Sequence, residues 1–269
     1  MNKKAVWTLL SVVMFLSAGI LLFYFFWANG YIDPPKTAPT TTYSEFTYPS
    51  LPSEVTIQPS ATNTNGDNAE DPYVNPVNFA ELQAVNPEIV GWIYMTTPFI
   101  SQPVLIDLSE TDYYLSRDAT GQYDRRGSLY IQSEFNNPDF EDPCTIIYGH
   151  RISDGSMLGN LQASFENIDI SENAQYVVIY LPETTKIYYI VATITYDESH
   201  ILYYNDFSSE EGFNGFFDKV YSSTGDEVQL VEDARPQFGD NVLILSTCLR
   251  TDRTRRFLVI AKEMIVELS

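Results

Sequence analysis

Short runs rich in Val, Ile and Tyr recur along the chain after about residue 90, and Gly, Pro, Asn and Asp separate them. β-branched and aromatic residues favour strands, and the separating residues favour turns. We therefore predict strands over Gly91–Met95, Gln102–Ile106, Ser128–Gln132, Cys144–Tyr148, Gln175–Leu181, Lys186–Tyr196, Asn241–Thr247 and Arg256–Val266. So many short strands in one domain predict a mainly β fold, as a sandwich or a closed barrel.

Two segments have helical spacing instead. Near the start of the predicted domain, around Pro87, the apolar residues are Phe79, Leu82, Val85 and Ile89, which predicts one or two short helices. Ahead of the cysteine-bearing strand, apolar residues recur at i, i+3, i+4 and i+7: Phe213, Phe216, Phe217 and Val220. Ser208 and Glu211 have the spacing of a capping box, so we predict an inserted helix that ends before Gly225.

An uninterrupted apolar segment covers residues 5–27 and contains no charge. A helix of that length spans the roughly 30 Å of a bilayer core. Lys3 and Lys4 precede it, so the positive-inside rule predicts residues 1–4 in the cytoplasm, a transmembrane signal anchor at 5–27, and an extracellular domain in a single-pass membrane protein. A cleaved signal peptide is the alternative, because residues 28–30 resemble a cleavage site, although the apolar run is long for one.

Residues 28–77 are rich in Pro, Thr, Ser and Asn and have few apolar clusters. Such a composition buries too little surface to fold, so we interpret this stretch as an extracellular flexible tether. The folded domain is predicted at 78–269. The formal net charge of the chain is −21, which argues against a nucleic-acid partner, because phosphate binding needs clustered Lys and Arg.

Candidate chemistry rests on few residues. The chain has two cysteines, Cys144 and Cys248, and two histidines, His150 and His200. Cys248 ends an apolar run and is followed by four arginines: Arg250, Arg253, Arg255 and Arg256. Positive charge stabilises a thiolate, the reactive form of cysteine. The alternatives are an ordinary buried cysteine or a disulfide between the two.

His150 also closes an apolar run, and an imidazole can donate a proton to a leaving amine near neutral pH. A structural histidine is the alternative, but strand ends within one sheet can converge, which favours a pairing with Cys248. His200 lies in a polar connection and is the weaker candidate. Neither a CxxC nor an HExxH motif occurs, so the sequence predicts no metal site.

These residues carry a family resemblance. Leu245–Cys248 (LSTC) resembles the TLxTC signature of sortases, with Ile244 where the family often has Thr, and Tyr148–His150 resembles the family's YGH. Arg256 resembles the arginine that opens the family's last strand. Further segments are similar to class B sortases, over about residues 79–266 in all: Asn86–Ile93, Pro103-Val104, Tyr113–Leu115, Asp154–Leu158 and the helical segment at 209–222.

The resemblance implies a closed eight-stranded sortase-type barrel with N-terminal helices and a helix before the cysteine-bearing strand. It implies that Cys248 is the nucleophile and that His150 protonates the leaving amine. It also implies that Arg256 stabilises the oxyanion, together with a backbone amide near the cysteine, or positions the peptide. Positions that match the family's peptide groove are Tyr148, Ser246 and Thr247. Alternation along the strand places Arg255 on the face opposite Arg256. Arg250 and Arg253 have no counterpart in the motif; we expect them to tune the thiol or meet substrate.

For function, the resemblance implies a cysteine transpeptidase without a cofactor, of Gram-positive origin. Its partners are then the sorting-signal peptides of secreted proteins, cut between their fourth and fifth residues, and an amine of the cell-wall cross-bridge or of a pilin lysine. Two departures leave the peptide preference open. Asp112 stands where many class B sequences have Asn, and Leu249 and Arg250 stand where several have an acidic residue. Neither the sorting motif nor the acceptor amine follows from the sequence.

Two other functions compete with this interpretation. LSTCLR is faintly similar to the SxGC-x-R signature of L,D-transpeptidases, but the Gly before the cysteine and that family's histidine motif are missing. A membrane-tethered adhesion or binding module would explain the anchor, the tether and the strands, but not the Cys–His–Arg arrangement. Residues 181–185 (LPETT) resemble a sorting signal, yet they lie between two predicted strands, so we interpret them as a turn.

Overall fold

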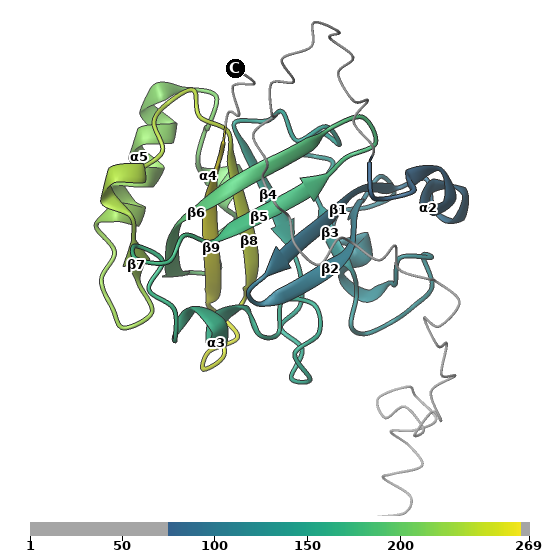
Figure 1. The fold of residues 1–269 in the computed structure, drawn as a ribbon, viewed down its shortest axis with the longest axis horizontal. Helices are drawn as coiled ribbons and strands as arrows, with labels where there is room; N and C mark the ends of the chain where they lie inside the picture. Colours follow the sequence, from purple (N-terminus) through teal and green to yellow (C-terminus); the bar gives the residue numbers. More distant parts are fainter. Residues whose placement is uncertain (1–74, 265–269) are drawn as a thin grey trace, which may run out of the picture. The chain divides into compact units, whose positions relative to one another are not determined.

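The computed structural model describes residues 75–264 (Figure 1). The predicted cytoplasmic residues 1–4, the predicted anchor at 5–27 and nearly all of the predicted tether at 28–77 lie outside the described residues. The elements below therefore belong to the predicted folded domain.

The predicted single-pass membrane localisation is contradicted. Within residues 75–264, no helix is long and apolar enough to cross a membrane. The longest helix of this part of the chain, α5 (Glu210–Tyr221), has 12 residues. It therefore extends only about 18 Å, against roughly 30 Å for a bilayer core.

Nine strands form one sheet in the described part of the chain: β1 (Ile89–Thr96), β2 (Phe99–Ile106), β3 (Leu129–Ile131), β4 (Cys144–Tyr148), β5 (Tyr176–Tyr180), β6 (Thr185–Tyr196), β7 (Gln229–Leu230), β8 (Val242–Cys248) and β9 (Arg256–Glu263). Their order is β5-β1-β2-β3-β4-β8-β9-β6-β7, and β5 also pairs with β6. That pairing closes eight strands into a barrel, and the two-residue β7 adds to β6. The predicted closed eight-stranded barrel is confirmed.

Pairing within the barrel is antiparallel except at two places, where β2 pairs with β3 and β4 pairs with β8 in parallel. All eight predicted strands are found, with ends shifted by at most three residues among those described. β7 was not predicted, because two residues carry no readable alternation.

Short helices surround the barrel: α2 (Phe79–Val85), η1 (Tyr113–Ser116), α3 (Leu161–Phe165), α4 (Ile201–Tyr204), α5 and η2 (Glu232–Ala234). The predicted inserted helix is confirmed as α5, but its predicted cap is one residue off. The Ser209 hydroxyl accepts from the Gly212 amide. Ser208 instead donates its hydroxyl and its amide to the Asp206 carboxylate, so the predicted box of Ser208 and Glu211 does not form.

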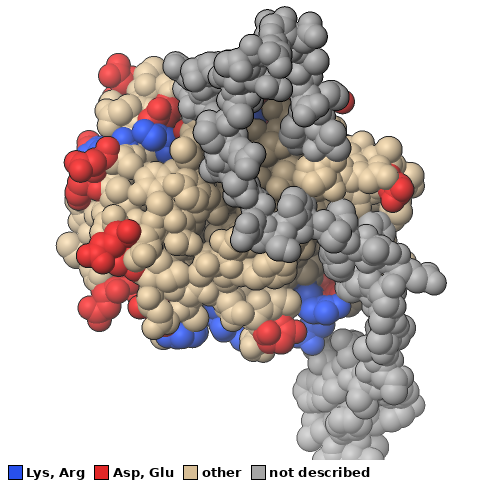
Figure 2. All heavy atoms as spheres, in the orientation of Figure 1, with Lys and Arg blue, Asp and Glu red and all other residues tan. Residues whose placement is uncertain are grey.

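The β4-β8-β9-β6 side of the sheet is buried on both faces because its strands alternate between two apolar clusters. In β8, Leu243 and Leu245 belong to the barrel interior, whereas Val242 and Ile244 belong to the outer cluster. The phenylalanines of α5 cover the outer cluster: Phe213, Phe216 and Phe217. Figure 1 shows α5 at one flank of the barrel, and acidic side chains line the same side in Figure 2.

We expect the contact between α5 and the sheet to contribute a large share of the stability. Phe216 is fully buried, so Phe216→Ala should lower the free energy of unfolding by about 3–5 kcal/mol. Phe99 is 74% exposed and is the matched control; Phe99→Ala should cost less than about 1 kcal/mol. Urea denaturation of both variants measures the difference. Equal losses would mean that α5 is not held by its apolar face.

Candidate active site

Strand pairing brings the three predicted catalytic residues to one edge of the sheet. Cys248 is the last residue of β8 and is paired with Arg256, the first residue of β9. On the other side of β8, Tyr148 of β4 is level with Ser246, and the Gly149 amide donates to the Ser246 carbonyl at 3.2 Å. Because β4 and β8 are parallel, His150, two residues after the end of β4, follows at the same edge at which Cys248 ends β8.

The side chains of Cys248 and Arg256 also share a face. Tyr148 packs against the outer cluster, to which Ile146, Ile244 and Leu258 belong. By the period of two along a strand, Cys248, Ser246 and Arg256 face the same outer side. Thr247 differs from the other predicted groove residues, Tyr148 and Ser246. It is level with Phe257 of the barrel interior and is 2% exposed.

Both cysteines are free thiols, which excludes the disulfide alternative. Cys144 is level with Val242, six residues before Cys248 along β8, a separation of about 20 Å. A disulfide requires a Cα–Cα distance of about 4.4–6.8 Å. Cys144 is buried, and burial raises the pKa of its thiol, so it stays protonated at neutral pH. Cys248 is half-buried.

A main-chain carbonyl orients His150. Its Nε2 lies 2.8 Å from the Leu115 carbonyl oxygen in η1. A carbonyl only accepts, so this nitrogen carries a proton and Nδ1 is the nitrogen left for other partners. η1 is itself anchored: the Tyr114 hydroxyl donates to Glu88 and accepts from Asn86 Nδ2 at 2.8 Å. The ring of His150 is therefore bonded to a turn that the buried Tyr114 anchors.

The side chains of three of the four arginines after Cys248 have separate contacts. Arg250 forms an ion pair with Glu166 at 2.7 Å, and exposed Arg255 donates to Thr195 at 2.8 Å. The half-buried Arg256 donates through Nη1 to the main-chain carbonyls of Arg253, at 3.1 Å, and Arg255, at 3.4 Å. The predicted difference in face between Arg255 and Arg256 agrees with these contacts.

The loop between β8 and β9 is closed by main-chain bonds. The Leu249 amide donates to the Arg255 carbonyl at 2.9 Å, and the Arg250 amide donates to Gln162 Oε1 at 2.8 Å. Leu249 is 3% exposed and belongs to the barrel interior. Both amides directly after the cysteine are thus engaged within the fold, so neither is free to act as the expected oxyanion donor without giving up its bond.

Tyr148 adds to the electrostatics of this edge. Burial raises the pKa of its hydroxyl, the nearby carboxylates of Asp112 and Asp107 add to the rise, and the positive charge of Arg256 opposes it. The phenol is therefore neutral at physiological pH. Because the Tyr148 phenol is neutral, it does not offset the positive charge of Arg256.

The sequence analysis named His200 and Asp112 but did not predict the hydrogen bonds that join them through Gln132. His200 Nε2 lies 2.7 Å from Gln132 Oε1, and its ring lies 6.3 Å from that of Tyr148. Gln132 Nε2 in turn donates to Asp112. No spacing or composition signal joins these residues, because they come from three distant segments.

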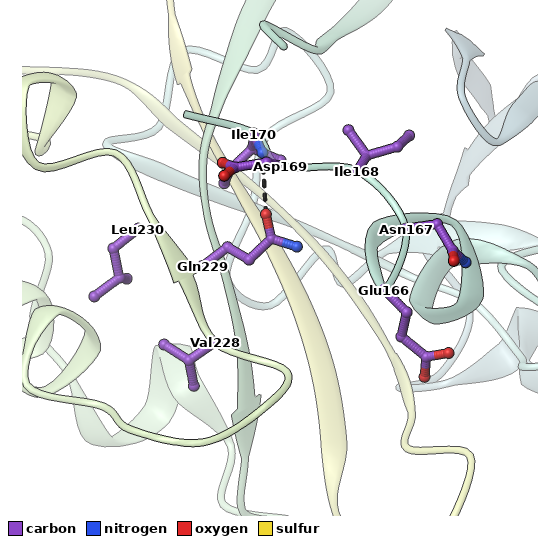
Figure 3. A pocket seen from close by; sticks show the side chains of 8 residues that line it. All are labelled: Glu166, Asn167, Ile168, Asp169, Ile170, Val228, Gln229 and Leu230. Atoms are coloured by element: carbon purple, nitrogen blue, oxygen red, sulfur yellow. Dashed lines mark hydrogen bonds between the residues drawn. The ribbon is translucent and has the colours of Figure 1, made fainter. Parts of the chain in front are cut away.

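A separate pocket of about 510 Å³ lies between residues 166–170 and residues 228–230 (Figure 3). Gln229 crosses it, accepting from the Ile170 amide at 3.0 Å. Cys248, His150 and Arg256 do not line this pocket. Within residues 75–264, no group of three or more His, Cys, Asp and Glu side chains is placed to hold a metal ion.

Comparisons with known proteins agree with this geometry. No protein-family model matches the chain. Sortase B of Staphylococcus aureus is 27% identical over 199 residues, which covers 71% of this chain and 75% of the relative. The crystal structure of sortase B from Bacillus anthracis in complex with AAEK2 matches with a TM-score of 0.59 and 28% identity, covering 69% of this chain and 82% of that one.

A third match is a complex of S. aureus sortase B with substrate, with a TM-score of 0.59 and 23% identity over 73% of this chain and 88% of that one; at this identity it supports the fold alone. The strand order, the inserted helix and the sequence likeness point the same way. Together they make this chain similar to class B sortases, and they support a transpeptidase of the sortase type.

Proposed function

We propose that the chain cleaves the C-terminal sorting signal of secreted proteins at Cys248 and transfers the new carboxyl group to an amine of the cell wall or of a pilin. The observation that carries this proposal is the strand register, with Cys248 opposite Arg256 and His150 one strand away. The sortase B relatives, together with the 28%-identical sortase B structure from B. anthracis, support the class of reaction.

In the first step, the Cys248 thiolate attacks the scissile carbonyl and a C–S bond forms. The tetrahedral intermediate collapses when the C–N bond breaks and His150 gives a proton to the departing amine. In the second step, an incoming amine attacks the thioester, passes a proton to His150 and displaces the sulfur. Nδ1 of His150 is suited to both transfers, because Nε2 is held by the Leu115 carbonyl.

Arg256 is the proposed donor to the oxyanion. A guanidinium has five N–H donors, and its bonds to Arg253 and Arg255 both use Nη1. The amides of Leu249 and Arg250 are already engaged, so more of the oxyanion stabilisation falls on this side chain. Ser246 and Tyr148 share the face of Cys248 and are proposed to contact the peptide.

Replacing the nucleophile separates an enzyme from a binding module. Cys248→Ala should lower cleavage of fluorogenic sorting peptides by about three orders of magnitude or more, because no other group supplies the covalent step. The matched control is Cys144→Ala, which removes a buried thiol away from the edge and should leave kcat within about two-fold. Cleavage that survives in Cys248→Ala would refute the proposal.

The two thiols should also differ in reactivity. We expect iodoacetamide to modify Cys248 in the native protein at neutral pH and to leave Cys144 unmodified, because Cys144 is buried and its pKa is raised. Peptide mass mapping after alkylation gives the extent at each site. Equal labelling of both cysteines without denaturant would contradict the described burial.

The guanidinium of Arg256 should matter through its shape as well as its charge. Arg256→Lys keeps the charge but loses the planar fork, and we expect kcat to fall by about 10²–10³-fold. Arg255→Lys is the matched control, since Arg255 is exposed and bonds to Thr195; its kcat should stay within about two-fold. Steady-state kinetics on one peptide compares them, and a larger loss in the Arg255 variant would reassign the role.

A further inference from the structure

His200, the histidine to which the proposed reaction gives no role, is held at both ring nitrogens. Nδ1 accepts from the Tyr203 amide at 3.2 Å and so caps the first turn of α4. Nε2 lies 2.7 Å from Gln132 Oε1. The ring itself lies 4.6 Å from Phe135 and 6.3 Å from Tyr148. With both nitrogens engaged, His200 is not free to exchange protons with a substrate.

The Asp112 carboxylate sets the direction of these bonds. A carboxylate only accepts, so Gln132 must turn its NH₂ group toward Asp112, where Nε2 lies 2.8 Å from Oδ1. Its Oε1 then faces His200 and also only accepts. His200 must therefore carry its proton on Nε2, which leaves Nδ1 unprotonated and able to accept from Tyr203. One carboxylate, on the exposed Asp112, thus favours the tautomer of a histidine two hydrogen bonds away, and the Tyr203 amide favours the same tautomer.

Asp112 is linked to His150 as well, through the main chain. It adopts a left-handed conformation with φ of 63° and caps η1, and its carbonyl accepts from the Leu115 amide at 2.9 Å. The Leu115 carbonyl is the group that holds His150 Nε2. A continuous hydrogen-bonded path therefore runs from α4 through His200, Gln132, Asp112 and Leu115 to His150.

Two further hydrogen bonds hold Asp112, the middle residue of this path. The Asp112 amide donates to Asp107 Oδ2 at 2.8 Å, and the Tyr130 hydroxyl donates to Asp112 Oδ1 at 2.6 Å. Gln132 is 3% exposed and Tyr130 is 2% exposed, so a lost bond leaves a polar atom buried and unpaired. The buried and satisfied part of this network, at Gln132 and Tyr130, restrains the groups that it joins.

We propose that Gln132 and His200 are positioning residues, which hold Asp112 and the Leu115 carbonyl in place and thereby orient His150. This inference rests on the proposed role of His150 in proton transfer. It predicts that breaking the path lowers kcat and leaves the binding of peptide nearly unchanged, because the effect reaches the reaction only through the orientation of one imidazole.

The tautomer of His200 is measured by NMR on the full-length chain labelled with ¹⁵N-histidine. The chain has only two histidines, so a His150→Asn variant assigns the signals. At pH 7 we expect His200 to be neutral with its proton on Nε2 in the wild type. Asp112→Asn should keep this signature, since an amide oxygen accepts both bonds and Asn tolerates the left-handed conformation. Gln132→Met should keep the tautomer, because the Tyr203 amide still donates to Nδ1, but should shift the Nε2 signal, because Nε2 loses its acceptor.

Kinetics tests the coupling to His150. We expect Gln132→Met to lower kcat about five-fold, the effect of one net hydrogen bond, with KM within about two-fold. His200→Asn keeps an N-cap side chain but loses the bond to Gln132, so it should show the same loss and should remain informative if the Gln132 variant does not fold. In the double variant of Gln132→Met and His200→Asn, kcat should be less than about two-fold lower than in either single variant. The matched control is Gln237→Met, an exposed glutamine, which should behave as wild type.

A charged or Nδ1-protonated His200 in the wild type would overturn the inference, as would an unchanged kcat or a loss confined to KM in both path variants. Failure of the proposed function is recognised separately, by a wild-type chain that cleaves no sorting peptide. The NMR result still decides the hydrogen-bond path in that case, because it does not depend on activity.

Discussion

The parallel pairing of β4 with β8 is the constraint on which the site depends. Parallel strands end at the same edge of a sheet, so His150, just after β4, and Cys248, at the end of β8, lie at one edge although they are far apart in sequence. β9 returns antiparallel from a short loop, which puts its first residue, Arg256, opposite Cys248. A slip of one residue in β8 would turn Cys248 toward the barrel interior, where Leu243 and Leu245 now pack.

Burial on both faces of this part of the sheet enforces that register. The barrel interior takes one set of β8 residues, and α5 covers the other set. Slipping would expose or misplace both sets at once, at a cost in hydrophobic burial on each face. The inserted helix therefore stabilises the geometry of the cysteine as well as the fold, even though none of its residues belongs to the site.

The arginines near the Cys248 thiol differ in their hydrogen-bond and ion-pair partners. Four arginines follow Cys248 in a chain with a formal net charge of −21, but their surroundings differ. Glu166 pairs with Arg250, and Thr195 holds the exposed Arg255. Arg256 contacts main-chain carbonyls, which keep its charge while fixing its direction. Neutral oxygens accept from both histidines: the Leu115 carbonyl from His150 and the Gln132 amide from His200. The orientation of each ring therefore depends on hydrogen bonds rather than on an ion pair.

The sequence by itself determined where the strands and the inserted helix lie, and it singled out Cys248, His150 and Arg256. These features are local: β-branched runs, turn residues, helical spacing and short motifs are readable within a few residues. The cap of α5 was misplaced by one residue because Asp206, outside the predicted box, takes the hydroxyl of Ser208.

Only the tertiary structure decided which side chains share a face and which segments meet. Thr247 lies next to Cys248 in the motif, yet alternation sends it to the barrel interior. Asp112, Gln132 and His200 come from three segments, and no pattern of spacing could join them, since their bonds follow from strand closure rather than from sequence neighbours. Strand and helix propensity depends on residues that are close together in the sequence. A site assembled from several strands of a barrel depends on the strand register, and the packing of the whole sheet sets that register.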